Sequence, residues 1–188
     1  QVMKLMRKFF RGNKKKSDRC VALVGMNAVG KSNFGKRLSS KLKLNRIDID
    51  QEFIKRNGII KDYISKNGEE NFRKLESQII IKSLKPGNLI ITGGGAIESD
   101  EVRSALKNKS AVIWIRAGKE KVKKHIAEAK KERHEFADKD PDVIASDLLA
   151  KRNPLYKEVA DITIHERVPF SQYLTIAIAE LGKFYKKD

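Results

Sequence analysis

GMNAVGKS, at residues 25–32, is the segment that most strongly indicates the fold. It follows the apolar run VALV at residues 21–24 and precedes a segment with helical spacing, so it lies where a strand turns into a helix. The pattern G-x-x-x-x-G-K-[ST] in this context is a phosphate-binding loop. Its glycines let backbone N–H groups converge on phosphate oxygens, and the following helix adds the positive end of its dipole. We therefore expect Lys31 to neutralise the β- and γ-phosphates of a nucleotide and the Ser32 hydroxyl to bind Mg²⁺.

Short apolar runs alternate with longer segments of helical spacing along the chain. The expected strands are residues 20–24, 46–49, 88–92, 111–116 and 161–165. The expected helices are residues 31–41, 69–84, 99–107, 119–131, 141–160 and 170–186. This alternation predicts an α/β fold, a three-layer α/β/α sandwich around a five-stranded parallel sheet. Ligands bind at the carboxyl ends of such strands, where the glycine and aspartate motifs of this sequence fall.

The bulk composition is that of one globular domain. With 188 residues, of which 40% are hydrophobic and 35% charged, the chain is long enough for a single α/β core. Its one cysteine, Cys20, excludes an internal disulfide and suits a reducing compartment. No apolar run approaches the ~20 residues that span a membrane, and no signal-peptide pattern is visible. We therefore expect a cytoplasmic monomer without a membrane span.

Much of the net charge of +17 lies near the N-terminus. Residues 1–20 hold eight Lys and Arg residues and one Asp. We interpret residues 1–19 as a basic N-terminal extension or linker and residues 20–188 as the domain itself. The apolar residues of the extension favour a helix that docks on the domain, and they also suit contact with a membrane surface, an acidic partner or nucleic acid. Because no nucleic-acid-binding motif is visible, no nucleic-acid partner is expected.

A pair of aspartates follows the second expected strand. Asp48 and Asp50 flank Ile49, so alternation along a strand puts both carboxylates on the same side. Two acids at a strand tip beside a triphosphate can divide the work. One holds the water shell of Mg²⁺, and the other takes the proton from an attacking hydroxyl. The competing interpretation is that Asp50 caps the helix that follows.

An arginine and three glycines indicate a second subsite. Arg73 and Glu76 are three residues apart in an expected helix, so the carboxylate can hold the guanidinium for bidentate capture of a substrate carboxylate. Such a pair is also a common surface feature. The glycines at residues 93–95 follow the third expected strand, where they allow a ligand to approach bare backbone.

Two further arginines are candidate anion ligands. Arg152 begins the motif RNPLY at residues 152–156, in the late helical region. Arg133 lies in the segment 130–140, which is almost wholly charged and is typical of a mobile loop. In a chain this basic, an isolated arginine is more often simply solvated, so these two positions gain weight only in combination with the other motifs.

In their order along the chain, these motifs resemble the shikimate kinase family, which has the P-loop nucleoside-monophosphate-kinase-like fold. The resemblance covers about residues 20–165 and rests on the phosphate loop, the DID motif at 48–50, FRKLE at 72–76, GGG at 93–95 and RNPLY at 152–156. It implies transfer of the γ-phosphoryl group of ATP to the 3-hydroxyl of shikimate in chorismate biosynthesis. ATP and shikimate would be the ligands and Mg²⁺ the cofactor, and a mobile lid would lie at about residues 130–140.

The resemblance also implies a role for each matching residue. Catalysis would fall to Asp50 as the base, with Lys31 and the lid residue Arg133. The ATP-binding residues would be Gly25, Ala28, Val29, Gly30, Lys31, Ser32, Asn33 and Arg133. The acceptor would be bound by Asp50, Arg73, Gly94, Gly95 and Arg152. Ser32 would bind the metal directly, and Asp48 would bind it through water.

The sequence departs from the family pattern at three places. Ala28 stands where a glycine is usual, which a negative φ accommodates, and Asn33 stands where threonine is usual. Arg133 is followed by His-Glu-Phe instead of Pro-Leu-Leu. Two alternative functions remain open. One is a kinase of another small anionic polyol, and the other is a catalytically weak ligand-sensing domain on the same scaffold. Two arginines favour an anionic acceptor, and the retained Lys31 and Asp50 argue against a sensor.

Overall fold

The structure is a computed structural model that describes residues 20–130 and 140–186. The basic extension expected at residues 1–19 lies outside the described residues. Arg133 and nearly all of the lid expected at residues 130–140 also lie outside them. The remaining candidate site residues are all described.

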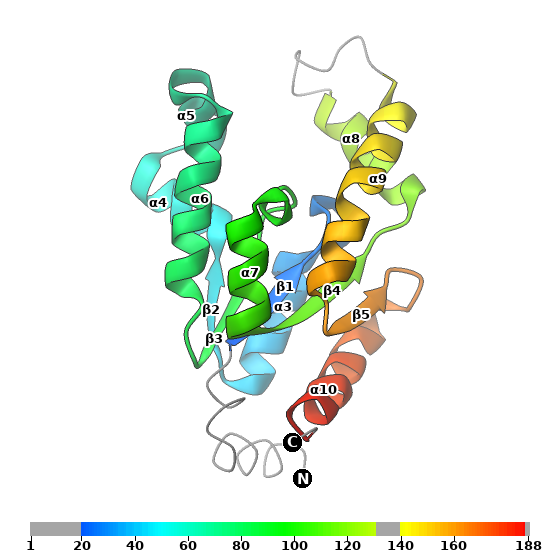
Figure 1. The fold of residues 1–188 in the computed structure, drawn as a ribbon. Coiled ribbons are helices and arrows are strands. Elements are labelled where there is room, and N and C mark those ends of the chain that lie inside the picture. The colour runs from blue at the N-terminus through cyan, green and yellow to red at the C-terminus, as the bar shows by residue number, and fades with distance from the viewer. Residues whose placement is uncertain (1–19, 131–139, 187–188) are drawn as a thin grey trace.

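Five parallel strands form one sheet in the order β2-β3-β1-β4-β5 (Figure 1). The strands are β1 (Cys20–Val24), β2 (Asn45–Asp48), β3 (Asn88–Ile91), β4 (Ser110–Arg116) and β5 (Ile162–His165). The central β1 is flanked by β3 and β4 and is buried along its whole length, as expected for a parallel strand covered on both faces. The five-stranded parallel sheet predicted from the sequence is confirmed.

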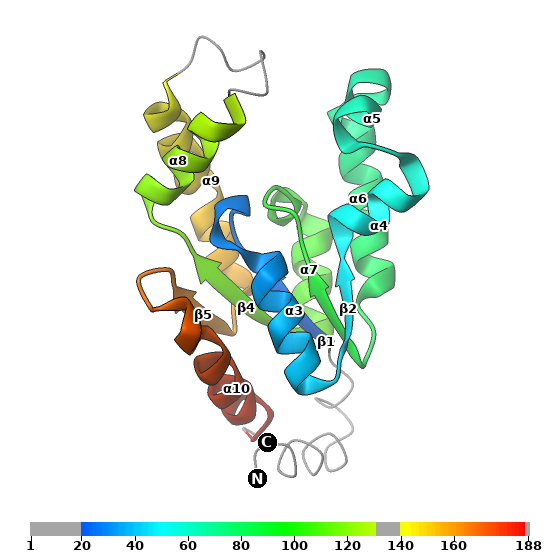
Figure 2. The same cartoon turned by 180° about the vertical axis from the view of Figure 1, so that it is seen from behind.

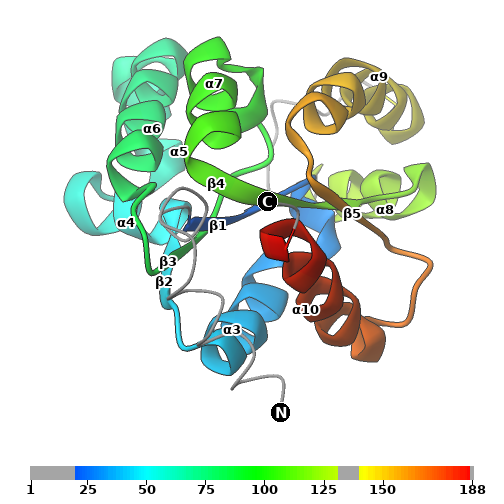
Figure 3. The ribbon, with the colours of Figure 1, turned by 60° about the horizontal axis from the view of Figure 1, so that its bottom comes forward.

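Helices cover both faces of the sheet, which confirms the three-layer fold. Those with a predicted counterpart are α3 (Lys31–Leu42), α6 (Glu69–Ser83), α7 (Asp100–Lys109), α8 (Lys119–Lys130), α9 (Pro141–Val159) and α10 (Phe170–Lys186). Figure 2 shows α3 and α10 together on one face, and Figure 3 shows α6, α7 and α9 on the other. Beyond the carboxyl ends of the strands, α5 and α6 rise on one side and α8 and α9 on the other (Figure 1).

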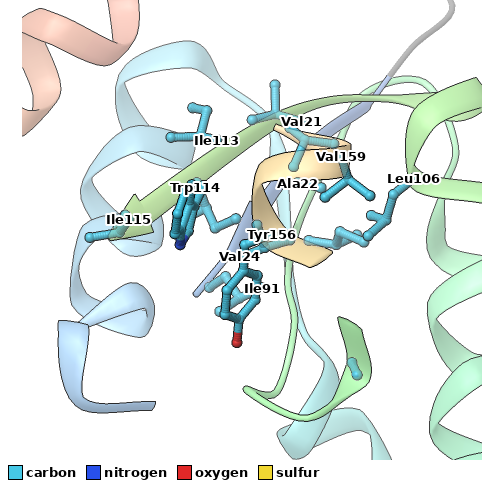
Figure 4. Packing of buried hydrophobic residues seen from close by; sticks show 14 of the residues in the cluster. Val21, Ala22, Val24, Ile91, Leu106, Ile113, Trp114, Ile115, Tyr156 and Val159 are labelled. Carbon is cyan, nitrogen blue, oxygen red and sulfur yellow. The ribbon is translucent and has the colours of Figure 1, made fainter. Parts of the chain in front are cut away.

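The core joins the sheet to the helix that carries Arg152. Figure 4 shows Trp114 of β4 beside Tyr156 of α9, and their rings are stacked with centroids 5.7 Å apart. Both side chains are buried, so the expected core position of Trp114 is confirmed. This packing fixes α9 against the carboxyl half of β4, next to the end of the sheet where ligands bind.

The second strand ends one residue earlier than predicted, and this moves Asp50 into a helix. Pairing of β2 with β3 ends at Asp48, and α4 (Ile49–Asn57) begins at the next residue. Asp50 and Glu52 lie in the first turn of α4, where acidic side chains complement the helix dipole. The prediction that Asp48 and Asp50 share one side of a strand is therefore wrong. Asp48 is the N-cap residue, so Asp50 does not cap the helix either.

A short helix, α5 (Ile60–Asn67), follows α4 and has no counterpart in the prediction. Gly58 ends α4 and Gly68 ends α5, with φ of 79° and 85°, which are left-handed values that favour glycine. The two helices pack with α6 through edge-to-face contacts of Phe53 with Tyr63 and Phe72. They brace the part of α6 that carries Arg73. Within residues 20–130 and 140–186, no helix is both long enough and apolar enough to cross a bilayer.

Candidate active site

Two glycines shape the phosphate loop at the end of β1. Gly25 has a φ of 140°, and a Cβ at this position would lie 2.5 Å from the carbonyl oxygen of Ile115. Gly30 has a φ of 74° and immediately precedes α3. Only glycine adopts both conformations without strain. The loop therefore turns sharply into α3 and places the unpaired N–H groups of the helix's first turn at the carboxyl end of the sheet.

The unusual residues of the loop fit its backbone. Ala28 lies in the 3-10 turn η1 (Asn27–Val29), and among the described non-glycine residues only Lys43 has a positive φ. The φ of Ala28 is therefore negative, so alanine fits at this position without strain. Asn33 is exposed on the first turn of α3.

The Lys31 side chain is buried and curls back over the loop. Its ammonium donates hydrogen bonds to the carbonyl oxygens of Gly25 at 2.7 Å and Met26 at 2.9 Å. Burial lowers the pKa of Lys31 to about 8, and the nearby carboxylates of Asp50 and Asp48 oppose that shift. A lysine desolvated in this way and held over backbone amides is suited to bind a strongly anionic group.

Ser32 and Asp48 form a pair of oxygen donors beside the loop. The Ser32 hydroxyl donates a hydrogen bond of 2.8 Å to Oδ2 of Asp48. Mg²⁺ prefers oxygen ligands and usually keeps several waters, so a hydroxyl with a carboxylate behind it suits this ion better than a cage of protein ligands would. In keeping with this, the described residues contain no cluster of three or more His, Cys, Asp or Glu side chains that would hold a metal alone.

Asp50 lies beside the first glycine of the triplet, where a Cβ at Gly93 would be 3.2 Å from its Oδ1. Burial and the charge of Asp48 raise the pKa of Asp50, while Lys31 and Arg73 partly offset the shift. The first turn of α4 thus supplies a half-buried carboxylate on which the charges of two cations, Lys31 and Arg73, act. A carboxyl group with a raised pKa is a better proton acceptor than an exposed aspartate.

Arg73 is held on α6 by two acidic side chains. Its guanidinium contacts Oε2 of the buried Glu76 at 2.8 Å and Oε1 of Glu69 at 3.3 Å, which confirms the predicted pair with Glu76. Burial raises the pKa of Glu76, and its Oε1 atom has no hydrogen-bond partner among the described residues. Burial opposes the charge of Arg73, but Glu76 outweighs it and raises the pKa of Arg73. Arg73 is therefore an oriented, permanently charged group.

The glycine triplet makes room for side chains of the site. A Cβ at Gly93 would lie 2.8 Å from Oε1 of Glu76 and 3.2 Å from Oδ1 of Asp50. A Cβ at Gly95 would collide with the guanidinium of Arg73. The sequence predicted that the triplet lets a ligand approach bare backbone. The structure adds that this turn is also the surface against which the carboxylates and the arginine are placed.

The middle glycine is bonded on both sides by residues that the sequence analysis gave no role. The Gly94 N–H donates to Oδ1 of Asn27 at 2.9 Å, and the Gly94 carbonyl accepts a hydrogen bond of 2.6 Å from the buried Tyr156 hydroxyl. Asn27 stands at a variable position of the phosphate-loop pattern, so no spacing rule singles it out. Tyr156 was part of the RNPLY motif, and its buried hydroxyl requires a partner.

Arg152 faces the site from α9. Its Nε donates to Oε1 of Glu98 at 2.8 Å, and its NH1 lies 3.8 Å from Sδ of Met26 in the phosphate loop. The charge of Arg152 also acts on Lys31 and on Glu76, where it lowers the pKa of each. Sequence reasoning missed Glu98, three residues after the glycine triplet, because a single acid there carries no recognisable pattern.

The fold thus gathers nearly all of the described candidates at one end of the sheet. Lys31 and Ser32 begin α3 with Asp48 hydrogen-bonded beside them, and Asp50 is close enough to feel the charges of both Lys31 and Arg73. A phosphate loop that lies beside a half-buried carboxylate and two arginines, each held by its own acidic partner, places the chain in the class of P-loop kinases that act on small molecules.

Comparison with known proteins defines the family within this class. A sequence model of the shikimate kinase family matches residues 27–179. The shikimate kinase of Nitrobacter winogradskyi is 34% identical over 155 residues, which cover 81% of this chain and 72% of the relative. Shikimate kinase 1 of Yersinia pestis is 34% identical over 148 residues, covering 78% of this chain and 86% of the relative.

A solved structure agrees with the sequence matches. The shikimate kinase of Acinetobacter baumannii, in complex with shikimate, aligns with a TM-score of 0.78 and 28% identity, over 93% of this chain and 98% of that chain. The chain belongs to the shikimate kinase family, whose members are small-molecule kinases.

Proposed function

We propose that this protein transfers the γ-phosphoryl group of ATP to the 3-hydroxyl of shikimate. The observation that carries the proposal is the position of the Asp50 carboxylate, which lies beside the glycine triplet next to Glu76, the partner of Arg73, and within electrostatic reach of Lys31 in the phosphate loop. Family membership favours this acceptor over another small anionic polyol, and it favours a kinase over a ligand-sensing domain. We infer that the protein works in the cytoplasm as a monomer, and that its product enters aromatic amino-acid biosynthesis.

The nucleotide side of the site consists of the phosphate loop and the start of α3. The β- and γ-phosphates would take the place of the Gly25 and Met26 carbonyls as partners of the Lys31 ammonium. The residues that we assign to ATP are Gly25, Ala28, Val29, Gly30, Lys31, Ser32 and Asn33, together with Arg133 from the lid. Glycine at 25 and 30 leaves the amides of the loop open to phosphate oxygens.

Mg²⁺ fits the oxygen pair of Ser32 and Asp48. We propose that the Ser32 hydroxyl binds the ion directly and that Asp48 holds one of its waters. When bound, Mg²⁺ would supply positive charge that offsets the charge of the phosphates. The present hydrogen bond between Ser32 and Asp48 keeps both oxygens in one place before the ion arrives.

The acceptor side of the site consists of two arginines that would hold a carboxylate, which we call the carboxylate clamp, and one aspartate that would accept a proton. Arg73 and Arg152 would bind the carboxylate of shikimate, because oriented guanidinium groups bind planar anions through paired hydrogen bonds. The backbone at Gly94 and Gly95 would contact the ring hydroxyls. Asp50 would then lie at the 3-hydroxyl and accept its proton as the oxygen attacks phosphorus. Catalysis consists mainly of positioning and charge neutralisation, to which we expect Arg133 to contribute.

A coupled assay of ADP release tests the proposed reaction. We expect fast release with ATP, Mg²⁺ and shikimate, and only slow hydrolysis without shikimate, because the proton acceptor and the attacking oxygen must both be in place. Release with a neutral cyclitol should stay at the background rate. Turnover with another sugar acid in place of shikimate would overturn the acceptor assignment. Binding of shikimate without any turnover would support the sensing alternative.

Replacement of Arg73 tests the carboxylate clamp. We expect Arg73→Ala to raise the KM for shikimate about 10- to 100-fold, the range for losing a hydrogen bond to a charged group, and to leave the KM for ATP nearly unchanged. Arg73→Lys should recover only part of the loss, since lysine does not form the bidentate contact. Initial rates with each substrate varied in turn provide the measurement.

The exposed Arg56 on α4 provides a matched control, because Arg56→Ala removes a surface arginine without a place in the site. Equal losses in the two KM values of Arg73→Ala would contradict the clamp. The thermal midpoint is measured as well, because Arg73→Ala leaves the buried Glu76 carboxylate without its cation.

A further inference from the structure

Glu98 lies three residues after the glycine triplet of residues 93–95, a segment called the glycine turn below, and it contacts two cationic side chains. Its Oε1 accepts the 2.8 Å hydrogen bond from Nε of Arg152, and its Oε2 accepts one of 2.6 Å from the ammonium of Lys151. Burial works to raise the pKa of Glu98, but the hydrogen bonds from Lys151 and Arg152 outweigh it and lower the pKa. Glu98 is thus a fixed anion in contact with one of the two arginines of the clamp.

The backbone of Glu98 is itself anchored. NH1 of Arg103 donates to the carbonyl oxygens of Ile97 at 2.9 Å and Glu98 at 3.2 Å. Arg103 is in turn held by Glu158 of α9, at 3.1 Å from its Nε. The Glu98 side chain therefore extends from a backbone that is tied to α7 and α9, the second of which also carries Arg152.

The geometry leaves one edge of Arg152 available for a ligand. Glu98 engages the Nε of the guanidinium, while NH1 lies against Sδ of Met26 in the phosphate loop. A thioether sulfur is a weak acceptor, so a carboxylate can replace it at little cost. With 13% of its side chain exposed, Arg152 is also confined by packing. Fixing Nε removes rotations that the arginine would otherwise lose only on binding a substrate.

We propose that Glu98 is a positioning residue for acceptor binding, which holds Arg152 by its Nε so that the terminal nitrogens are ready for the carboxylate of the acceptor. The inference rests on the proposed function, since it names what orients one half of the clamp. Glu98 does not cancel the charge of the clamp, because Lys151 balances the charge of Glu98, and Arg73 is paired separately with Glu69 and Glu76. Glu98 thus holds Arg152 of α9 as Glu76 holds Arg73 of α6.

The test combines kinetics with a structure. We expect Glu98→Ala to raise the KM for shikimate about tenfold, the loss of one charge-assisted hydrogen bond, while kcat and the KM for ATP stay nearly unchanged. Glu98→Gln keeps an oxygen for Nε and should limit the rise to about threefold. The double variant Glu98→Ala/Arg152→Ala should have the same KM as Arg152→Ala, because a residue that acts only through Arg152 has nothing left to position. Glu180→Ala on α10 removes a carboxylate with a similar 2.6 Å lysine contact and serves as the control.

The outcomes separate this inference from the proposed function. An unchanged or lower KM for shikimate in Glu98→Ala would overturn it, as would additive losses in the double variant. If the wild-type protein does not use shikimate, the proposed function fails, and a crystal structure of unliganded Glu98→Ala still decides the inference. A displaced or disordered Arg152 guanidinium in that structure supports positioning by Glu98, and an unmoved one refutes it.

Discussion

Replacing Asp50 by asparagine is expected to lower kcat by about 10²- to 10⁴-fold, the usual contribution of a positioned general base. Asparagine has nearly the same shape and can still accept a hydrogen bond, but it cannot take the proton of an attacking hydroxyl. Nucleotide affinity should be almost unchanged, because in the proposed site Lys31 and the loop amides, and not Asp50, would bind the phosphates. The measurements are steady-state rates with shikimate and calorimetric titration with ATP. A large loss of ATP affinity would show that Asp50 acts in nucleotide binding instead.

The pH dependence of kcat/KM for shikimate adds a second readout for Asp50, because this ratio reports the pKa values of the free protein. Burial and the charge of Asp48 raise its pKa, and only the ionised form accepts a proton. Activity should therefore be present above the raised pKa and be lost as the pH falls through it, at a higher pH than for an ordinary aspartate. Asp50→Asn should lack this acid limb in its residual activity. The control is Asp62→Asn, which changes an exposed aspartate of α5 and should keep both the wild-type rate and the loss of activity at low pH.

Replacing Lys31 by methionine is expected to lower kcat/KM for ATP by about 10³-fold, as for removal of a donor to charge that develops in a transition state. Methionine fills a similar volume, so the loss measures the ammonium. In this protein that ammonium is buried against the loop carbonyls and has Asp50 and Asp48 nearby. The exposed Lys36 of the same helix supplies the control, and Lys36→Met should behave as the wild type. A loss of similar size in Lys36→Met would point to the general basic charge of α3.

Titration of ATP at several pH values distinguishes charge from packing at Lys31. Burial lowers the pKa of Lys31 to about 8, so the free protein loses this positive charge as the pH rises through that value. Affinity for ATP should fall over the same range, since phosphates bind the protonated form. Lys31→Met has no proton to lose there and should show a flat profile. A wild-type affinity that stays constant from neutral to alkaline pH would contradict this account.

The fold was predictable because its signals are local. Continuous apolar runs and the glycine-rich loop located every strand to within one residue at each end. The errors arose where the hydrophobic pattern changes from that of a strand to that of a helix. Ile49 is compatible with the last residue of a strand and with the first residue of a helix. The structure assigns it to the helix, because pairing of β2 with β3 ends at Asp48 and Ile91. α5 is only eight residues long, too short for a clear apolar stripe.

The site was predictable only as far as its groups belong to recognisable motifs. The phosphate loop, the glycine triplet and the pair of Arg73 and Glu76 could be read from spacing. The partners Asn27 and Glu98 could not, because each meets its contact across the fold, from Asn27 to Gly94 and from Glu98 to Arg152. Contacts between distant segments leave no periodic trace in one sequence. Such partners nevertheless orient the groups that the motifs supply.

The glycine turn also bears on how this protein can change by mutation. A methyl group at each of its three positions would meet different side chains: Glu76 and Asp50 at the first, Asn27 at the second and Arg73 at the third. Alanine at Gly95 would displace the guanidinium of Arg73, so we expect it to weaken acceptor binding as Arg73→Ala does. At the second position, alanine becomes acceptable once residue 27 is shortened. We therefore expect a substitution in this turn to be accepted most readily together with a change in the side chain that it would meet.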